Sequence, residues 1–132
     1  MVLLSAITLA KVNAGFSAYN FTMCYLFPGK SIGQFLPKLE AKNKPLVEYC
    51  FTFVGQHDVP WLLMSLLVVK SGTVSKEYMM ASIGWWYFVA VDIGCRVCGR
   101  AEEHGGDKNT VIPFVPICVI FGLLNVLAYR EM

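Results

Sequence analysis

Residues 46–69 read LVEYCFTFVGQHDVPWLLMSLLVV. The run is long enough to cross a bilayer, which takes about 20 consecutive and predominantly apolar residues. It nevertheless contains several polar side chains, namely Glu48, Thr52, Gln56, His57 and Asp58. Because polar and ionisable groups are costly in hydrocarbon, these side chains are expected to face other protein segments rather than lipid.

Three further apolar segments can shelter this one: residues 3–27, 78–95 and 111–129. Of the 132 residues, 56% are hydrophobic and only 15% are charged, against about 25% charged in ordinary globular proteins. The charges also gather in the links between the apolar runs. The sequence therefore predicts a single all-α domain, 1–132, that is a bundle of four transmembrane helices joined by short links.

The first apolar segment carries small and polar residues at helical spacing. Asn13, Ser17 and Asn20 lie on one predicted face together with alanines. Such a face is typical of close helix packing, because small residues let helices approach and amide side chains bond across them. In the link that follows, residues 29–45, Ser31 and Gln34 resemble a capping box and predict a short interfacial helix.

Pro60 interrupts the hydrogen-bonding pattern of the second segment. A proline removes the bond to the carbonyl four residues earlier, so a kink near Gln56 is expected. An alternative makes Asp58 the N-cap of a short helix from Val59 to Lys70. Because so short a helix cannot span the membrane alone, we favour a continuous, kinked helix.

Basic residues set the predicted orientation. The first and third links contain more lysine and arginine than the second link and the C-terminal tail. The positive-inside rule then places both termini on the outer, lumenal or intermembrane side. Helix depths suggest buried ion pairs that offset the cost of charge in the membrane. The residues expected to form them are Lys11 with Asp58, and Glu48 and Asp92 with Arg96.

Two features suggest a cofactor or pigment. His57 can ligate a haem iron or a chlorophyll magnesium, or it can form a structural hydrogen bond. Trp85 and Trp86 lie in the middle of the third segment, although tryptophan normally prefers the membrane interface. These rings can bind a quinone, lipid or pigment, or they can pack between helices.

Metal and catalytic signatures are weak. Cys95, Cys98 and His104 supply three potential zinc ligands, whereas a structural zinc site needs four. The chain has no HExxH, GxSxG, P-loop or GxGxxG motif. We therefore predict no metal site, no catalytic residue and no required cofactor, and the sequence leans against an enzyme.

Met1 leads directly into an apolar run without a basic region, so a cleavable signal peptide is not expected.

These features favour a non-catalytic accessory or structural subunit of a larger membrane complex. An energy-transducing complex (respiratory, ATP synthase or photosynthetic) is the leading interpretation, with other membrane subunits and lipids as partners. The mitochondrial inner membrane is the first expectation, with thylakoid or endoplasmic reticulum membrane as alternatives. The rival hypothesis is a small independent lipid-, quinone- or pigment-binding membrane protein, an enzyme or transporter that uses His57 and Asp58. A net charge of only +2 implies no nucleic-acid partner.

Overall fold

The computed structural model describes residues 4–92, 103, 106, 109 and 112–132, and all regular secondary structure in these residues is helical. The prediction of an all-α fold is confirmed. The helices in chain order are α1 (Ala6–Phe21), the π-helix η1 (Thr22–Leu26), α2 (Pro28–Phe35), the 3-10 helix η2 (Ala41–Asn43), α3 (Lys44–Ser71), α4 (Lys76–Val91) and α7 (Phe114–Arg130).

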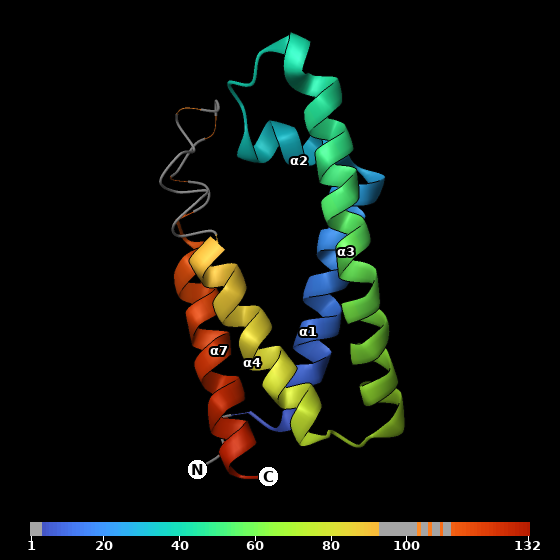
Figure 1. Ribbon diagram of the computed structural model, residues 1–132, viewed down its shortest axis with the longest axis vertical. Helices are drawn as coiled ribbons and strands as arrows, with labels where there is room; N and C mark the ends of the chain where they lie inside the picture. Colours follow the sequence, from blue (N-terminus) through green and yellow to red (C-terminus); the bar gives the residue numbers. More distant parts are fainter. Residues whose placement is uncertain (1–3, 93–102, 104–105, 107–108, 110–111) are drawn as a thin grey trace.

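The long helices form two antiparallel pairs. α1 packs along α3, and α4 packs along α7. In Figure 1 the two pairs come together at the end where both termini lie and separate towards the other end, where α2 crosses. Both termini and the turn between α3 and α4 therefore share one end of the molecule, and the first link occupies the opposite end.

One stretch of the described chain is long and apolar enough to cross a membrane. It is Ala41–Ser71, which comprises η2 and α3, and only 22% of its most apolar window is buried inside the protein. α7 is a shorter apolar helix of 17 residues, while α1 and α4 each have 16. At 1.5 Å per residue, each of these three covers about 25 Å, slightly less than the hydrocarbon core.

Helix ends follow ordinary capping chemistry. The Oγ atoms of Ser5 and Ser75 accept hydrogen bonds from the third following backbone N–H, at the starts of α1 and α4. Gly72 ends α3 with φ of 69°, a left-handed conformation that glycine adopts without strain. Glu77 lies in the first turn of α4, where hydrogen bonds to its own backbone and to Ser75 lower the pKa of its carboxyl group.

α3 runs without interruption through Pro60, so the favoured continuous helix is confirmed and the alternative of a new helix beginning at Val59 is excluded. The predicted capping role of Ser31 was wrong. α2 begins with Pro28 in its first turn rather than after a Ser31 cap. Ser31 lies inside that helix, and its hydroxyl donates to the carbonyl of Met23 at 2.8 Å. Proline at a helix start is favoured because its missing N–H would have no partner there.

Large apolar side chains on the helices face outward, including Phe53, Leu63, Leu67, Met80, Phe88, Ile120 and Leu123, each more than half exposed. The interior contains an apolar core that includes Leu9, Met79 and Trp86. In the described residues it also contains seven buried polar side chains: Asn13, Ser17, Ser31, Asp58, Ser65, Ser82 and Asn125. The bundle thus buries polar side chains within an apolar core and has a largely apolar exterior on its helices.

Candidate functional site

Asn13 is the centre of a buried hydrogen-bond network. Its Nδ2 donates to the Tyr78 hydroxyl at 3.0 Å and to Ser82 Oγ at 2.8 Å. Its Oδ1 accepts a hydrogen bond from Trp86 Nε1 at 2.8 Å. One fully buried amide from α1 therefore binds three side chains of α4, and it does so where the two helix pairs meet.

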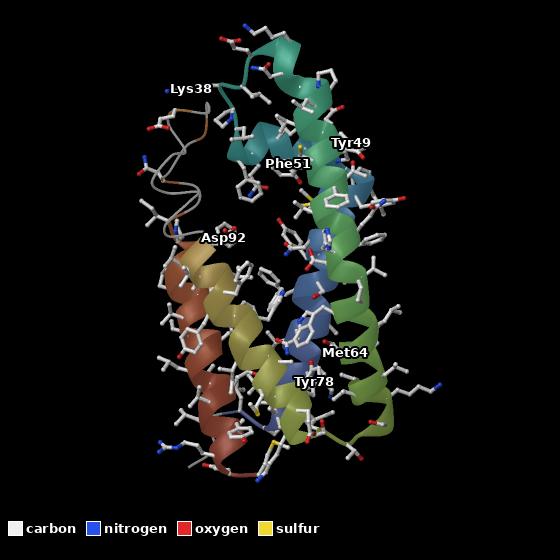
Figure 2. The ribbon with its side chains drawn as sticks, viewed as in Figure 1. Lys38, Tyr49, Phe51, Met64, Tyr78 and Asp92 are labelled. Atoms are coloured by element: carbon white, nitrogen blue, oxygen red, sulfur yellow. The ribbon has the colours of Figure 1, made fainter. Side chains whose placement is uncertain are left out.

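The network extends to the remaining two long helices. Ser65 of α3 lies 2.9 Å from the hydroxyl of Tyr78, which is labelled in Figure 2 near the start of α4. Ser82 donates to Asn125 Oδ1 of α7 at 2.7 Å, and Asn125 Nδ2 donates to the carbonyl of Phe121 at 2.7 Å. Because buried polar groups are costly unless paired, this connected set favours one register of all four helices.

Aromatic rings surround the network. Trp61 stacks on Tyr78, with ring centroids 5.4 Å apart, and on Trp85 at 5.7 Å. Trp86 stacks on Phe121 at 5.0 Å. Trp85 and Trp86, predicted as possible cofactor contacts, thus lie against each other and against rings from the other helices. Such contacts are worth about 0.5–1.5 kcal/mol each beyond burial, and they give these tryptophans a packing role.

A second polar cluster lies where α1 continues into the π-helix η1. Asp58 of α3 is only 8% exposed and hydrogen-bonds with the side chain of Asn20. Cys24 of η1 hydrogen-bonds with Ser31 of α2 nearby. Single-turn π-helices are frequent at functional sites, and here the π-helix brings polar side chains of four elements together.

Gly55 is what lets α3 approach η1 closely. A Cβ atom added to Gly55 would lie 2.8 Å from the backbone nitrogen of Tyr25 and 3.2 Å from the carbonyl carbon of Cys24. Real Cβ atoms are essentially never closer than 3.0 Å to another heavy atom. The contact between α3 and the π-helix therefore requires glycine at this position.

Several predicted site residues lie elsewhere than expected. Lys11 and Glu48 are exposed rather than buried, because each points away from the face its helix buries. His57 is also exposed, with its ring edge against Phe53 at 4.6 Å. The ion pair observed in the described residues is a surface pair, Glu40 with Lys42 at 2.8 Å.

The other predicted residues divide into two groups. Asn13 and Ser17 are fully buried, and Asn20 is partly buried beside Asp58. Asp92, labelled in Figure 2, lies at the C-terminal end of α4 and is partly buried. Arg96, predicted to pair with Asp92, lies outside the described residues. The same holds for the three potential zinc ligands Cys95, Cys98 and His104.

Sequence reasoning missed four of the six side chains in the network. Ser65, Tyr78, Ser82 and Asn125 were not singled out, although each is buried. Asn125 offered the clearest signal, because an amide inside an apolar span needs a partner. Among the described residues, no three His, Cys, Asp or Glu side chains are placed to hold a metal ion.

No known protein family, no curated protein and no solved structure matches this chain. The site must therefore be interpreted from its own geometry. The network around Asn13 consists of neutral groups that use their donors and acceptors on one another, an arrangement suited to holding helices together. Two buried atoms, Ser17 Oγ and Trp61 Nε1, have no hydrogen-bond partner in the described part of the chain.

Proposed function

We propose that this protein is a non-catalytic accessory subunit of a larger complex in an energy-transducing membrane, with four membrane-spanning helices. The mitochondrial inner membrane is the leading location, with both termini on its outer side. The alternatives are a thylakoid or endoplasmic reticulum membrane.

The observation that carries the membrane assignment is the apolar exterior of the helices, on which many large apolar side chains are exposed. In water, exposing so many large apolar side chains on three helices would create a contiguous aggregation-prone surface. In lipid, the same exterior is favourable, while small and polar residues hold the helices together from inside. The low burial of the apolar window in Ala41–Ser71 agrees, since the core helix of a water-soluble protein is mostly buried.

The accessory role is supported by how the polar groups are used. Buried donors and acceptors around Asn13 bind one another, and the neighbouring rings cover one another. One surface available to a partner is the outer face of α1, where Lys11, Gly15 and Tyr19 are all exposed. These residues follow one another every four positions, so they share one side of the helix. A lysine within an apolar helix favours a protein partner that pairs with it.

The decisive test is the mass of the particle extracted in mild detergent, with its absorption spectrum and its co-migrating chains. An accessory subunit travels in a large assembly without a chromophore of its own. Migration as a small particle with bound pigment, haem or quinone would overturn the proposal. That result would favour the independent ligand-binding protein, in which His57→Ala should then remove the ligand.

A pair of matched variants tests the proposed partner face. A Cβ atom on Gly15 or on Gly84 would meet nothing within 4 Å, and both residues are exposed, so a side chain at either position points away from the chain's own core. Gly15→Leu on α1 should block a close-packed partner helix and release the protein from the assembly. Gly84→Leu on α4 is the control and should leave the assembly intact. Equal behaviour of the two variants would contradict the assignment of the α1 face.

A further inference from the structure

The end of the molecule formed by α2, η2 and the first turns of α3 concentrates positive charge. Between Gly29 and Glu48 there are four lysines, Lys30, Lys38, Lys42 and Lys44, and two acidic residues, Glu40 and Glu48. All four lysines are exposed. Glu40 pairs with Lys42 at 2.8 Å, whereas the other three lysines form no ion pair within the described part of the chain.

The opposite end carries a smaller excess of positive charge. The basic residues there are Lys70, Lys76 and Arg130, and they lie close in sequence to two acidic residues, Glu77 and Glu131. Lys76 also lies over the ring of Tyr129, with its Nζ 5.9 Å from the ring centroid. The excess of basic over acidic residues is therefore two at the first end and one at the opposite end.

Exposed apolar and aromatic side chains border the basic end. Tyr25, Phe27, Leu46 and Tyr49 are all exposed, Tyr49 at 71%. Lys30 Nζ lies 4.9 Å from the centroid of the Phe27 ring. In Figure 2, Tyr49 on α3 and Lys38 in the link lie at the same end. Tyrosine at headgroup depth with lysine just beyond it is the usual composition of a membrane interface.

We infer that the basic end of the bundle, carried by Lys30, Lys38 and Lys44, binds acidic phospholipid headgroups at one face of the membrane. This inference rests on the proposed membrane location. A lipid is favoured over an acidic protein segment because the lysines are spread over a helix, a link and a second helix, and exposed apolar and aromatic side chains of η1 and α3 adjoin them. A membrane surface offers headgroups to dispersed lysines and an acyl region to the apolar side chains next to them.

The probe is a short-chain phosphatidylglycerol, compared with phosphatidylcholine of the same chain length and with inorganic phosphate. Binding is titrated against the full chain in mild detergent. Wild-type protein should prefer phosphatidylglycerol, and the preference should weaken as salt screens the charges. One lysine near an acidic surface contributes a factor of about five in affinity. The triple variant Lys30→Gln, Lys38→Gln, Lys44→Gln should therefore lose the preference by about a hundredfold.

The matched control carries Lys70→Gln, Lys76→Gln and Arg130→Gln, which remove the same charge from the opposite end. It should keep the preference to within about threefold of wild type. Lys38→Gln alone changes a residue outside any helix and should lower the preference about fivefold, which covers the case that a triple variant fails to fold.

Three outcomes would overturn the inference. They are equal affinity for the two lipids, an equal loss in the control, and inorganic phosphate competing as strongly as the lipid. A separate measurement, retention of the chain in membranes washed with alkaline carbonate, tests the membrane location itself. A retained chain without lipid preference refutes the lipid inference alone, whereas a chain that is washed off refutes both.

Discussion

Replacing Gly55 by alanine tests the close packing of α3 on the π-helix. The added Cβ atom would lie 2.8 Å from the Tyr25 backbone nitrogen and 2.9 Å from the Tyr25 Cβ. Both neighbours belong to or adjoin the backbone, so no side-chain rotation can relieve the contact. The two helices must move apart, and the cluster of Asn20 and Asp58 must loosen with them.

The magnitude follows from two opposing terms. Alanine is favoured over glycine inside a helix by about 1 kcal/mol. Overpacking a well-filled contact costs about 1–3 kcal/mol. Gly55→Ala should therefore be destabilising by roughly 0–2 kcal/mol, whereas alanine at an open helical position should be stabilising by about 1 kcal/mol. The difference between the two variants isolates the contact itself.

Two other glycines provide graded controls. Gly84 is helical, and a Cβ atom added there would meet nothing within 4 Å, so Gly84→Ala should be stabilising. A Cβ atom on Gly122 would meet the ring of Tyr87 at 3.1 Å, but the outer edge of a ring can shift. Gly122→Ala should therefore fall between the other two. Denaturant unfolding in detergent, followed by tryptophan fluorescence, gives the three free energies of unfolding under one set of conditions.

The order of the three variants is the critical result. Gly84→Ala should be the most stable, then Gly122→Ala, then Gly55→Ala. If Gly55→Ala were as stable as Gly84→Ala, α3 and η1 would not approach as closely as described, and the explanation of Gly55 would be wrong.

Three further predictions concern the interior and the helix ends. Asn13→Leu removes three interhelical hydrogen bonds and, at about 0.6 kcal/mol per bond, should lower the free energy of unfolding by about 2 kcal/mol. Tyr78→Phe loses two of these bonds and should lower it by about 1 kcal/mol. Unchanged stability in both variants would refute the network. Ser17→Leu inserts a large side chain at a fully buried position and should destabilise the isolated chain itself, as measured by the same unfolding experiment, rather than only its assembly. The folded-state pKa of Glu77 is lowered, so its stabilising contribution is fully present above the unfolded-state pKa and is lost as pH falls through the folded-state pKa. The difference in free energy of unfolding between wild type and Glu77→Gln should therefore shrink on acidification. A difference that does not depend on pH would contradict this prediction.

The sequence predicted the helices better than their internal contacts. Apolar runs separated by charged links place the long helices to within a few residues of α1, α3, α4 and α7, because run length and link composition are local properties. Asn13 and Ser17 were selected for the same reason, since small and polar residues at helical spacing favour a packed face. The predicted capping role of Ser31 failed because Pro28 starts that helix one turn earlier.

The role of a polar residue depends on what lies opposite it, and spacing along one helix does not contain that information. Lys11 and Asp58 were expected to meet on the basis of equal depth, yet one is exposed and the other is buried beside Asn20. Depth fixes a height along the bundle, whereas rotation about the helix axis decides which neighbour a side chain reaches.

An apolar chain of this composition, with most of its charges in the links, already predicts an all-helical fold with an apolar exterior. Those properties follow from hydropathy and helix period, which are additive along the chain. Only the tertiary structure decides that the network around Asn13 joins four helices and that Gly55 lets α3 approach the π-helix closely. Both facts depend on the distance between residues far apart in sequence, and that distance is set when the helices pack.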